Sequence, residues 1–192
     1  MARTKEFDRD LALTQAIATF AQHGFEGTST EALLSAMNIR RQSLYDTFGD
    51  KWRLYLEALK RYSSDSIGAQ LVALESAPTG EAGVEALLAH AVARALADPE
   101  PACLGIAAIC EFGRSQPEIT ALTEAMGRLL VRAVERRVAE AVTAGAFAED
   151  VDVATAGPFV LATLTGIKVA ARQGAPGELL HAIARMALRS FR

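Results

Sequence analysis

The sequence predicts an all-α fold of about nine helices. Alanine and leucine dominate the composition, and only 6% of the 192 residues are aromatic. Such a composition favours helix over sheet. Glycine and proline cluster at a few points, where they separate long stretches with apolar residues at helical spacing. No stretch is convincing as a strand.

Turn residues divide the beginning of the chain into short helices. The first helix is expected from about Phe7 to His23, and Gly24 then tolerates the left-handed backbone that ends a helix. Thr28 and Glu31 match a capping box, in which two side chains satisfy free backbone N–H groups. We therefore expect a second helix to begin at Thr28.

Asn38 marks the turn between the second and third helices, because asparagine is the best non-glycine residue for a positive φ. Gly49 ends the third helix, and Asp50 is a good N-cap for a fourth helix that runs to about residue 75. Later breaks at glycine and proline predict five further helices, over about residues 81–97, 102–113, 117–144, 152–173 and 178–191.

The third helix carries polar side chains on the side that its apolar residues leave open: Arg40, Arg41, Gln42, Ser43 and Tyr45. A short helix with such side chains fits the major groove of DNA. Arg41 can pair with guanine and Gln42 with adenine, so we expect these two to read bases. Arg40 could read a base or hold a phosphate, and Ser43 is small enough for close approach.

The charge balance argues against a protein that coats polyanions without sequence preference, because such proteins are usually basic overall. The net charge of the chain is −3, from 20 Lys and Arg against 23 Asp and Glu. Residues 1–60 hold eight of each kind, so this part is neutral. Attraction to phosphate must therefore come from local clustering of Arg40, Arg41, Lys51 and Arg53.

The two cysteines, Cys103 and Cys110, lie seven residues apart. On one helix their Cα atoms would be roughly 10 Å apart, too far for a disulfide. Apolar surroundings favour inert buried thiols over oxidant sensors. No zinc-ligand spacing occurs, so we expect neither a metal nor a cofactor.

We expect a cytoplasmic protein. The N-terminus lacks the apolar core of a signal peptide. The longest nearly uncharged run, residues 153–167, is shorter than a membrane span.

Three segments resemble the DNA-binding domain of the TetR family of transcriptional repressors: Gly24 to Thr30, Met37 to Arg40 and Ser43 to Lys51. They carry the family's loop, cap, turn and Leu-Tyr-x-x-Phe-x-x-Lys features in order. The resemblance implies a helix-turn-helix DNA-binding domain over residues 1–50 and a helical ligand-binding and dimerisation domain over residues 51–192. Asn38 stands where the family usually has glycine, and Arg40 stands where it often has serine or threonine. Arg40 adds a cation at the groove, so the operator sequence could differ from those of other family members.

The resemblance also implies further contacts to DNA. Tyr45 and Lys51 match family positions that contact phosphates, and Lys51 at a helix start adds to a backbone-amide anion site. Thr28 and Thr30 could bond phosphate at the start of the second helix, although Thr28 is a cap first. Thr47 is a further candidate for phosphate.

In the family, the last two helices meet their copies across a two-fold axis as a four-helix bundle. We therefore expect a homodimer that places two recognition helices at palindromic half-sites. The expected interface residues combine small and large apolar side chains: Phe159, Ala162, Gly166, Ala170, Leu180 and Ile183.

A ligand pocket is likewise implied, with lining candidates Tyr62, Cys103, Ile106, Cys110, Phe112, Met126, Phe159 and Thr163. Few charged side chains are expected to line this pocket, so we expect the ligand to be an apolar or aromatic small molecule. It would favour a dimer whose recognition helices are wrongly spaced for the operator.

Several alternatives stay open. Glu111, in an apolar helix and the one charge expected to be buried, is either a partner for an arginine such as Arg114 or Arg128, or a polar anchor in the pocket. A DNA-binding adaptor controlled by a protein partner is possible in place of a ligand-responsive repressor. An all-helical enzyme is the remaining alternative, but no nucleophile–base pair or glycine-rich phosphate loop supports it.

Overall fold

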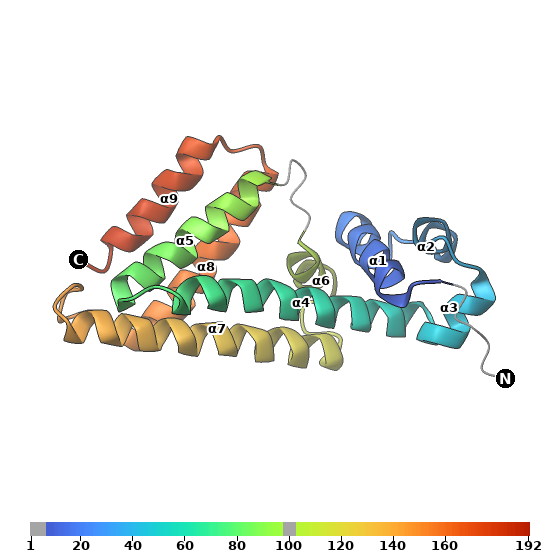
Figure 1. Cartoon of the computed structure of the whole chain (residues 1–192), viewed down its shortest axis with the longest axis horizontal. Helices are drawn as coiled ribbons and strands as arrows, with labels where there is room; N and C mark the ends of the chain where they lie inside the picture. Colours follow the sequence, from blue (N-terminus) through green and yellow to red (C-terminus); the bar gives the residue numbers. More distant parts are fainter. Residues whose placement is uncertain (1–6, 98–102) are drawn as a thin grey trace. The chain divides into compact units, whose positions relative to one another are not determined.

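The computed structural model describes residues 7–97 and 103–192. This part of the chain forms nine α-helices and no strand, as the sequence predicts (Figure 1). The helices are α1 (Arg9–His23), α2 (Thr30–Met37), α3 (Arg41–Phe48), α4 (Lys51–Glu75), α5 (Gly80–Ala97), α6 (Leu104–Phe112), α7 (Pro117–Thr143), α8 (Val153–Arg172) and α9 (Gly177–Arg189).

These helices form two compact units. In the described part, unit 1 comprises residues 7–64 and 103–123, and unit 2 comprises residues 65–97 and 124–192. The boundary that we expected at residue 50 differs from this division, because α4 and α6 contribute to the core under α1–α3. Leu54, Leu59 and Leu104 are fully buried in the same apolar cluster as Phe20 and the residues of α2 and α3.

The start of α2 corrects one prediction. Ser29, rather than Thr28, is the N-cap, and its hydroxyl accepts the N–H of Ala32 at 3.0 Å. Thr28 is only 1% exposed, and its hydroxyl donates to the carbonyl of Gly24. The capping box of Thr28 and Glu31 was therefore wrong by one residue, because three successive hydroxyl residues can each act as a cap.

The turn between α2 and α3 agrees with the sequence. Asn38 has φ 51° and ψ 48°, the left-handed conformation, and is the one non-glycine residue with positive φ in the described part. Gly49 closes α3 with φ 86°. Asp50 caps α4, since its Oδ1 accepts the N–H of Arg53 at 2.8 Å. The predicted end of the third helix at Gly49 and the predicted N-cap of the fourth helix at Asp50 are both confirmed.

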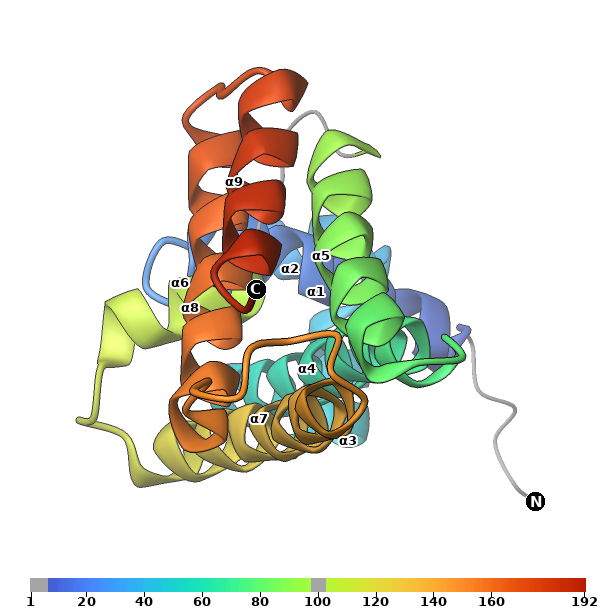
Figure 2. The same ribbon diagram turned by 90° about the vertical axis from the view of Figure 1, so that its left-hand side faces the viewer.

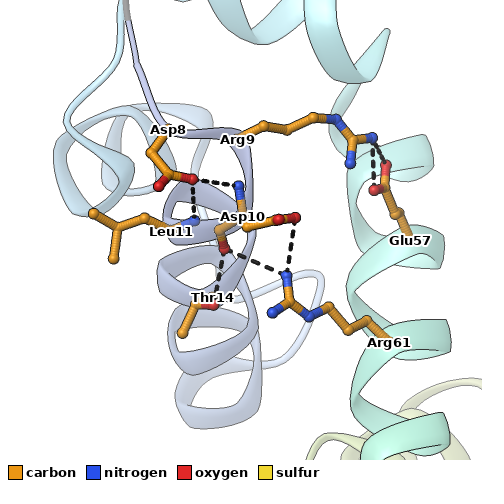
Figure 3. A network of polar contacts seen from close by, with 7 residues as sticks. All are labelled: Asp8, Arg9, Asp10, Leu11, Thr14, Glu57 and Arg61. Carbon is orange, nitrogen blue, oxygen red and sulfur yellow. Dashed lines mark hydrogen bonds and ion pairs between the residues drawn. The ribbon is translucent and has the colours of Figure 1, made fainter.

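Polar contacts attach α1 to α4 (Figure 3). Arg9 donates to the carboxylate of Glu57 at 2.9 Å, and its guanidinium lies 5.1 Å from the ring centroid of Phe48 in α3. Arg61 lies 3.4 Å from the carboxylate of Asp10. Pairs as exposed as these contribute only about 0–1 kcal/mol each, so their effect is to fix how α1 lies on α4 and α3.

In unit 2, helices α5, α8 and α9 lie side by side (Figure 2). Arg137 in α7 is 8% exposed and donates to the carbonyls of Ala77, at 2.7 Å, and Thr79. It also pairs with Glu140 at 2.8 Å. A buried guanidinium thus satisfies the free carbonyls between α4 and α5.

Helix α8 leaves much of its apolar surface uncovered. It is the one helix in the described part that is long and apolar enough to cross a membrane, by length and composition only. This indication is weak, because apolar helices of soluble proteins pass the same test. The uncharged run ends at Ile167 as expected, but the helix continues through Lys168 to Arg172, and only 28% of its apolar window is buried.

Candidate nucleic-acid interface

Helix α3 has two clearly different sides. Leu44 and Phe48 are buried in the core of unit 1. Arg40, Arg41, Gln42 and Tyr45 are exposed, while Ser43 and Thr47 are half-buried. Arg40 occupies the N-cap position without a side-chain capping bond, and it forms no ion pair within residues 7–97 and 103–192. Its guanidinium is therefore available to a ligand.

The guanidinium of Arg41 pairs with the carboxylate of Glu31 at the start of α2. Both side chains are largely exposed, at 55% and 71%. An ion pair this exposed contributes at most about 1 kcal/mol, so a base or a phosphate can compete for Arg41. Sequence reasoning missed Glu31 because it assigned that residue to a capping box.

Lys51, the first residue of α4, is half-buried. Its ammonium lies 4.2 Å from the ring centroid of Phe25, a cation–π contact with the turn after α1. Arg53 lies 3.8 Å from Asp50. The cation that we assigned to phosphate is therefore held in place by an aromatic ring.

The two threonines at the start of α2 differ. Thr30 is the first residue of α2 and is half-buried. Thr28 is buried and hydrogen-bonded within its own turn, so the structure does not favour the predicted contact between Thr28 and phosphate.

The turn after α1 contributes Phe25 to an aromatic cluster. The other rings of this cluster are those of Trp52, Tyr55 and Phe112. Ring centroids within it are 5.2 Å apart for Phe25 and Trp52 and 5.9 Å apart for Phe25 and Phe112. The hydroxyl of Tyr55 is buried and has no hydrogen-bond partner within the described part of the chain. Burial raises the pKa of Tyr55 above its ordinary value, and the negative charge of Glu111 adds to that shift.

Glu111 in α6 accepts two backbone N–H groups of the turn after α1. One carboxylate oxygen accepts from Phe25 at 2.8 Å, and the other from Glu26 at 2.6 Å. Glu111 is exposed, so the expectation of a buried charge was wrong. Arg128, one of its expected partners, pairs with Glu124 at 3.3 Å. The sequence around Glu111 did not indicate its contact with the turn after α1, because that turn precedes Glu111 by more than 80 residues.

The ligand candidates fall into two groups. Tyr62, Ile106 and Phe112 are half-buried in unit 1, and Phe112 is part of the aromatic cluster. Met126, Phe159 and Thr163 belong to unit 2; there Thr163 donates to the carbonyl of Phe159, whose ring contacts Phe191. Their role in ligand binding stays a prediction.

The two cysteines also differ. Cys103 is buried at the N-cap of α6, whereas Cys110 is exposed, and both are free thiols. The expectation of two buried thiols was wrong for Cys110, because α6 is covered on one side only. Within the described residues, no group of three or more His, Cys, Asp and Glu gathers to hold a metal ion.

The expected interface residues lie mostly at the surface of unit 2. Phe159 is 39% exposed, Ala162 and Gly166 are exposed, and Ala170 and Ile183 are half-buried. Leu180 is fully buried in the apolar core of unit 2, so this structure does not favour its place at an interface, which stays a prediction. Its neighbour Leu179, on the outer side of α9, is 48% exposed.

The three-helix arrangement and the exposed polar side of α3 define a helix-turn-helix DNA-binding protein. Known proteins agree. The model of the family described as "Bacterial regulatory proteins, tetR family" matches residues 12–58.

Two curated proteins are similar. YezE of Bacillus subtilis (strain 168), an uncharacterized HTH-type transcriptional regulator, is 39% identical over 132 residues, which cover 68% of each chain. The HTH-type transcriptional repressor ComR of Escherichia coli (strain K12) is 29% identical over 97% of this chain and 90% of ComR.

A solved structure is similar over its whole length. It contains a cysteine mutant of CifR, a TetR family transcriptional regulator, complexed with 26-base-pair double-strand operator DNA. The sequences are 35% identical, the TM-score is 0.83, and the match covers 99% of this chain and 100% of that one. The chain belongs to the TetR family and is a DNA-binding transcriptional regulator.

Replacing Tyr55 by phenylalanine should change how stability depends on pH. The folded protein keeps the Tyr55 proton above the pH at which the unfolded chain loses it, near 10. The folded state then binds more protons, so the free energy of unfolding falls as pH rises above about 10. We expect Tyr55→Phe to flatten that fall and, at pH 7, to leave stability equal or raise it by up to about 1 kcal/mol.

Urea unfolding at pH 7 and between pH 9 and 11 measures both effects. The control is Tyr45→Phe, which removes an exposed hydroxyl and should leave the alkaline fall unchanged. An identical alkaline fall in Tyr55→Phe and the wild type would contradict the shifted Tyr55 pKa.

Proposed function

We propose that the chain is a repressor that binds a palindromic operator as a homodimer and is released by a small apolar or aromatic molecule. DNA binding is supported by the exposed polar side of α3. Arg40, Arg41 and Gln42 are exposed to solvent, whereas Leu44 of the same helix is buried in the core. The repressor role is supported by the likeness to ComR.

The side chains divide into two kinds of contact. Arg41 and Gln42 have the donor and acceptor patterns that match guanine and adenine edges, each at about 1–3 kcal/mol of discrimination. Tyr45 and Thr47 lie in the same helix, Thr30 begins α2 and Lys51 begins α4, and all four side chains suit phosphates. Many DNA-binding proteins are attracted to the phosphate backbone by an overall positive charge. Residues 1–60 carry no net charge, so here the attraction has to come from individual cations placed close to phosphates.

The homodimer is supported by the uncovered side of α8 and α9. Exposed residues follow one another at helical spacing along α8, and they are small or apolar: Pro158, Phe159, Ala162, Thr165, Gly166 and Val169. On α9, Leu179 and Met186 are 48% and 65% exposed. An apolar helical surface of this kind suits self-complementary packing across a two-fold axis.

The effector part rests on the apolar candidates of α6 and α8, and on the absence of charge among them. The alternative is an adaptor controlled by a protein partner. The two differ in one respect: a small molecule alone releases the operator from the repressor, whereas the adaptor keeps its DNA in a screen of small molecules.

Selection of bound DNA from a random pool tests the proposal. We expect the full-length protein to enrich an inverted repeat whose half-sites lie about one helical turn apart or a multiple of it. Enrichment of a single half-site would contradict the dimer, and no enrichment over the starting pool would contradict sequence-specific binding.

Two substitutions should separate base reading from phosphate contact. Arg41→Ala should relax sequence preference at one base pair per half-site, by about 1–3 kcal/mol. Lys51→Met keeps the side-chain stem over Phe25 but removes the charge, so it should weaken binding to all sequences about equally and reduce the salt slope by about 1. Affinities for the selected operator and for altered operators measure both, and equal losses on every operator for Arg41→Ala would refute its base-reading role.

Gly166 offers a test of the dimer. A Cβ at this position meets no atom within 4 Å in the single chain, so Gly166→Leu should leave the fold of the subunit intact. If α8 packs against a second copy there, overpacking of about 1–3 kcal/mol should weaken the dimer roughly five- to 150-fold. Gly68→Leu in α4 is the control, since Gly68 is equally open. Sedimentation at micromolar concentration distinguishes them, and equal dimer affinities would argue against α8 at the interface.

A further inference from the structure

We propose that Glu111 is a positioning residue for DNA binding, a role that rests on the proposed function. Its carboxylate comes from α6 and holds the turn between α1 and α2, so that α2 and Lys51 keep their places. The contact has two hydrogen bonds, from the N–H of Phe25 at 2.8 Å and from the N–H of Glu26 at 2.6 Å.

The turn has N–H groups that need an acceptor. Helix α1 ends at His23, and Gly24 has φ 72°, which turns the chain out of the helix. The N–H groups of Phe25 and Glu26 then point toward Glu111, and each carboxylate oxygen accepts one of them. Successive N–H groups in a turn can form a concave anion site, and a carboxylate is a strong acceptor for it.

Glu111 also packs closely against the turn. A Cβ at position 24 would lie 2.9 Å from the nearer carboxylate oxygen of Glu111, so any other residue there would push this carboxylate away from its present position. The requirement at Gly24 is thus double, because its φ also lies in the region that favours glycine.

The turn between α1 and α2 contacts parts of the candidate DNA interface. The Phe25 ring lies under the ammonium of Lys51 and contacts Trp52 and Phe112. Thr28, four residues past Gly24, donates to the Gly24 carbonyl just before the Ser29 cap of α2. A displaced turn would therefore move both a phosphate contact and the start of α2.

The negative charge is essential to this role. A glutamine at position 111 has the size of glutamate but only one acceptor oxygen, and its NH₂ group would face a backbone N–H. The turn would then sample other conformations, and the apparent operator affinity would fall with the fraction of molecules that keep the competent one.

The experiment compares full-length wild type with Glu111→Gln and with the control Glu118→Gln. Glu118 is a second carboxylate of unit 1, and it accepts the indole N–H of Trp52 at 3.2 Å without touching the turn. Amide-resolved hydrogen exchange is measured without DNA, and operator affinity is measured as a function of salt.

In the wild type we expect the amides of Phe25 and Glu26 to exchange more slowly than the amide of Gly27. In Glu111→Gln these two amides should exchange about tenfold faster, as loss of a charge-assisted bond implies. Amides in the middle of α1 and α2 should stay as they are, whereas a general loss of stability would accelerate all of them. Operator affinity should fall about five- to tenfold with an unchanged salt slope, because the fraction of molecules that keeps the competent turn binds with all of its phosphate contacts. Glu118→Gln should match the wild type in both measurements.

Unchanged exchange at Phe25 and Glu26 in Glu111→Gln would overturn the contact. Faster exchange with undiminished operator affinity would overturn the role in DNA binding. If the wild type binds no DNA, the proposed function is wrong, but the exchange data still decide the contact. Should Glu111→Gln not fold, Glu111→Ala takes its place under the same criteria, since residue 111 is exposed and alanine removes both acceptor oxygens.

Discussion

Unit 1 depends on a core that α1, α2 and α3 do not close by themselves. These three helices are short, and two of them have only eight residues each. The buried side chains of α4 and α6, Leu54, Tyr55 and Leu104 among them, complete the cluster around Phe20. The polar side of α3 can face solvent because its apolar side is buried in this way. The helix that suits DNA is therefore held by the neighbouring α4 and, through Leu104, by a helix far from it in sequence.

Electrostatics refine this arrangement. Arg9 pairs with Glu57, Arg41 pairs with Glu31, and Lys51 lies over an aromatic ring. Each contact is individually weak at the surface. Together they give the cations of a neutral segment defined positions, which suits selective recognition better than long-range attraction to any polyanion.

Local signals explain why most helix ends could be predicted. Asn38, Gly49 and Asp50 act through their own backbone or the next few residues, so their effect can be read from neighbouring letters. The same logic left an ambiguity at Thr28 and Ser29, where adjacent hydroxyl residues compete for one cap. Burial decided it, because Thr28 is enclosed and Ser29 is not.

The sequence by itself determined the all-α class, the turn before α3, the exposed polar side of that helix and the family. Each of these follows from periodicity, capping or a motif, which are properties of short segments. Only the tertiary structure decided the partners of Glu111 and Arg41, the burial of Leu180 and Thr28, and the exposure of Cys110. Those outcomes depend on which distant segments pack together and on which side of each helix they cover, and no local pattern contains that information.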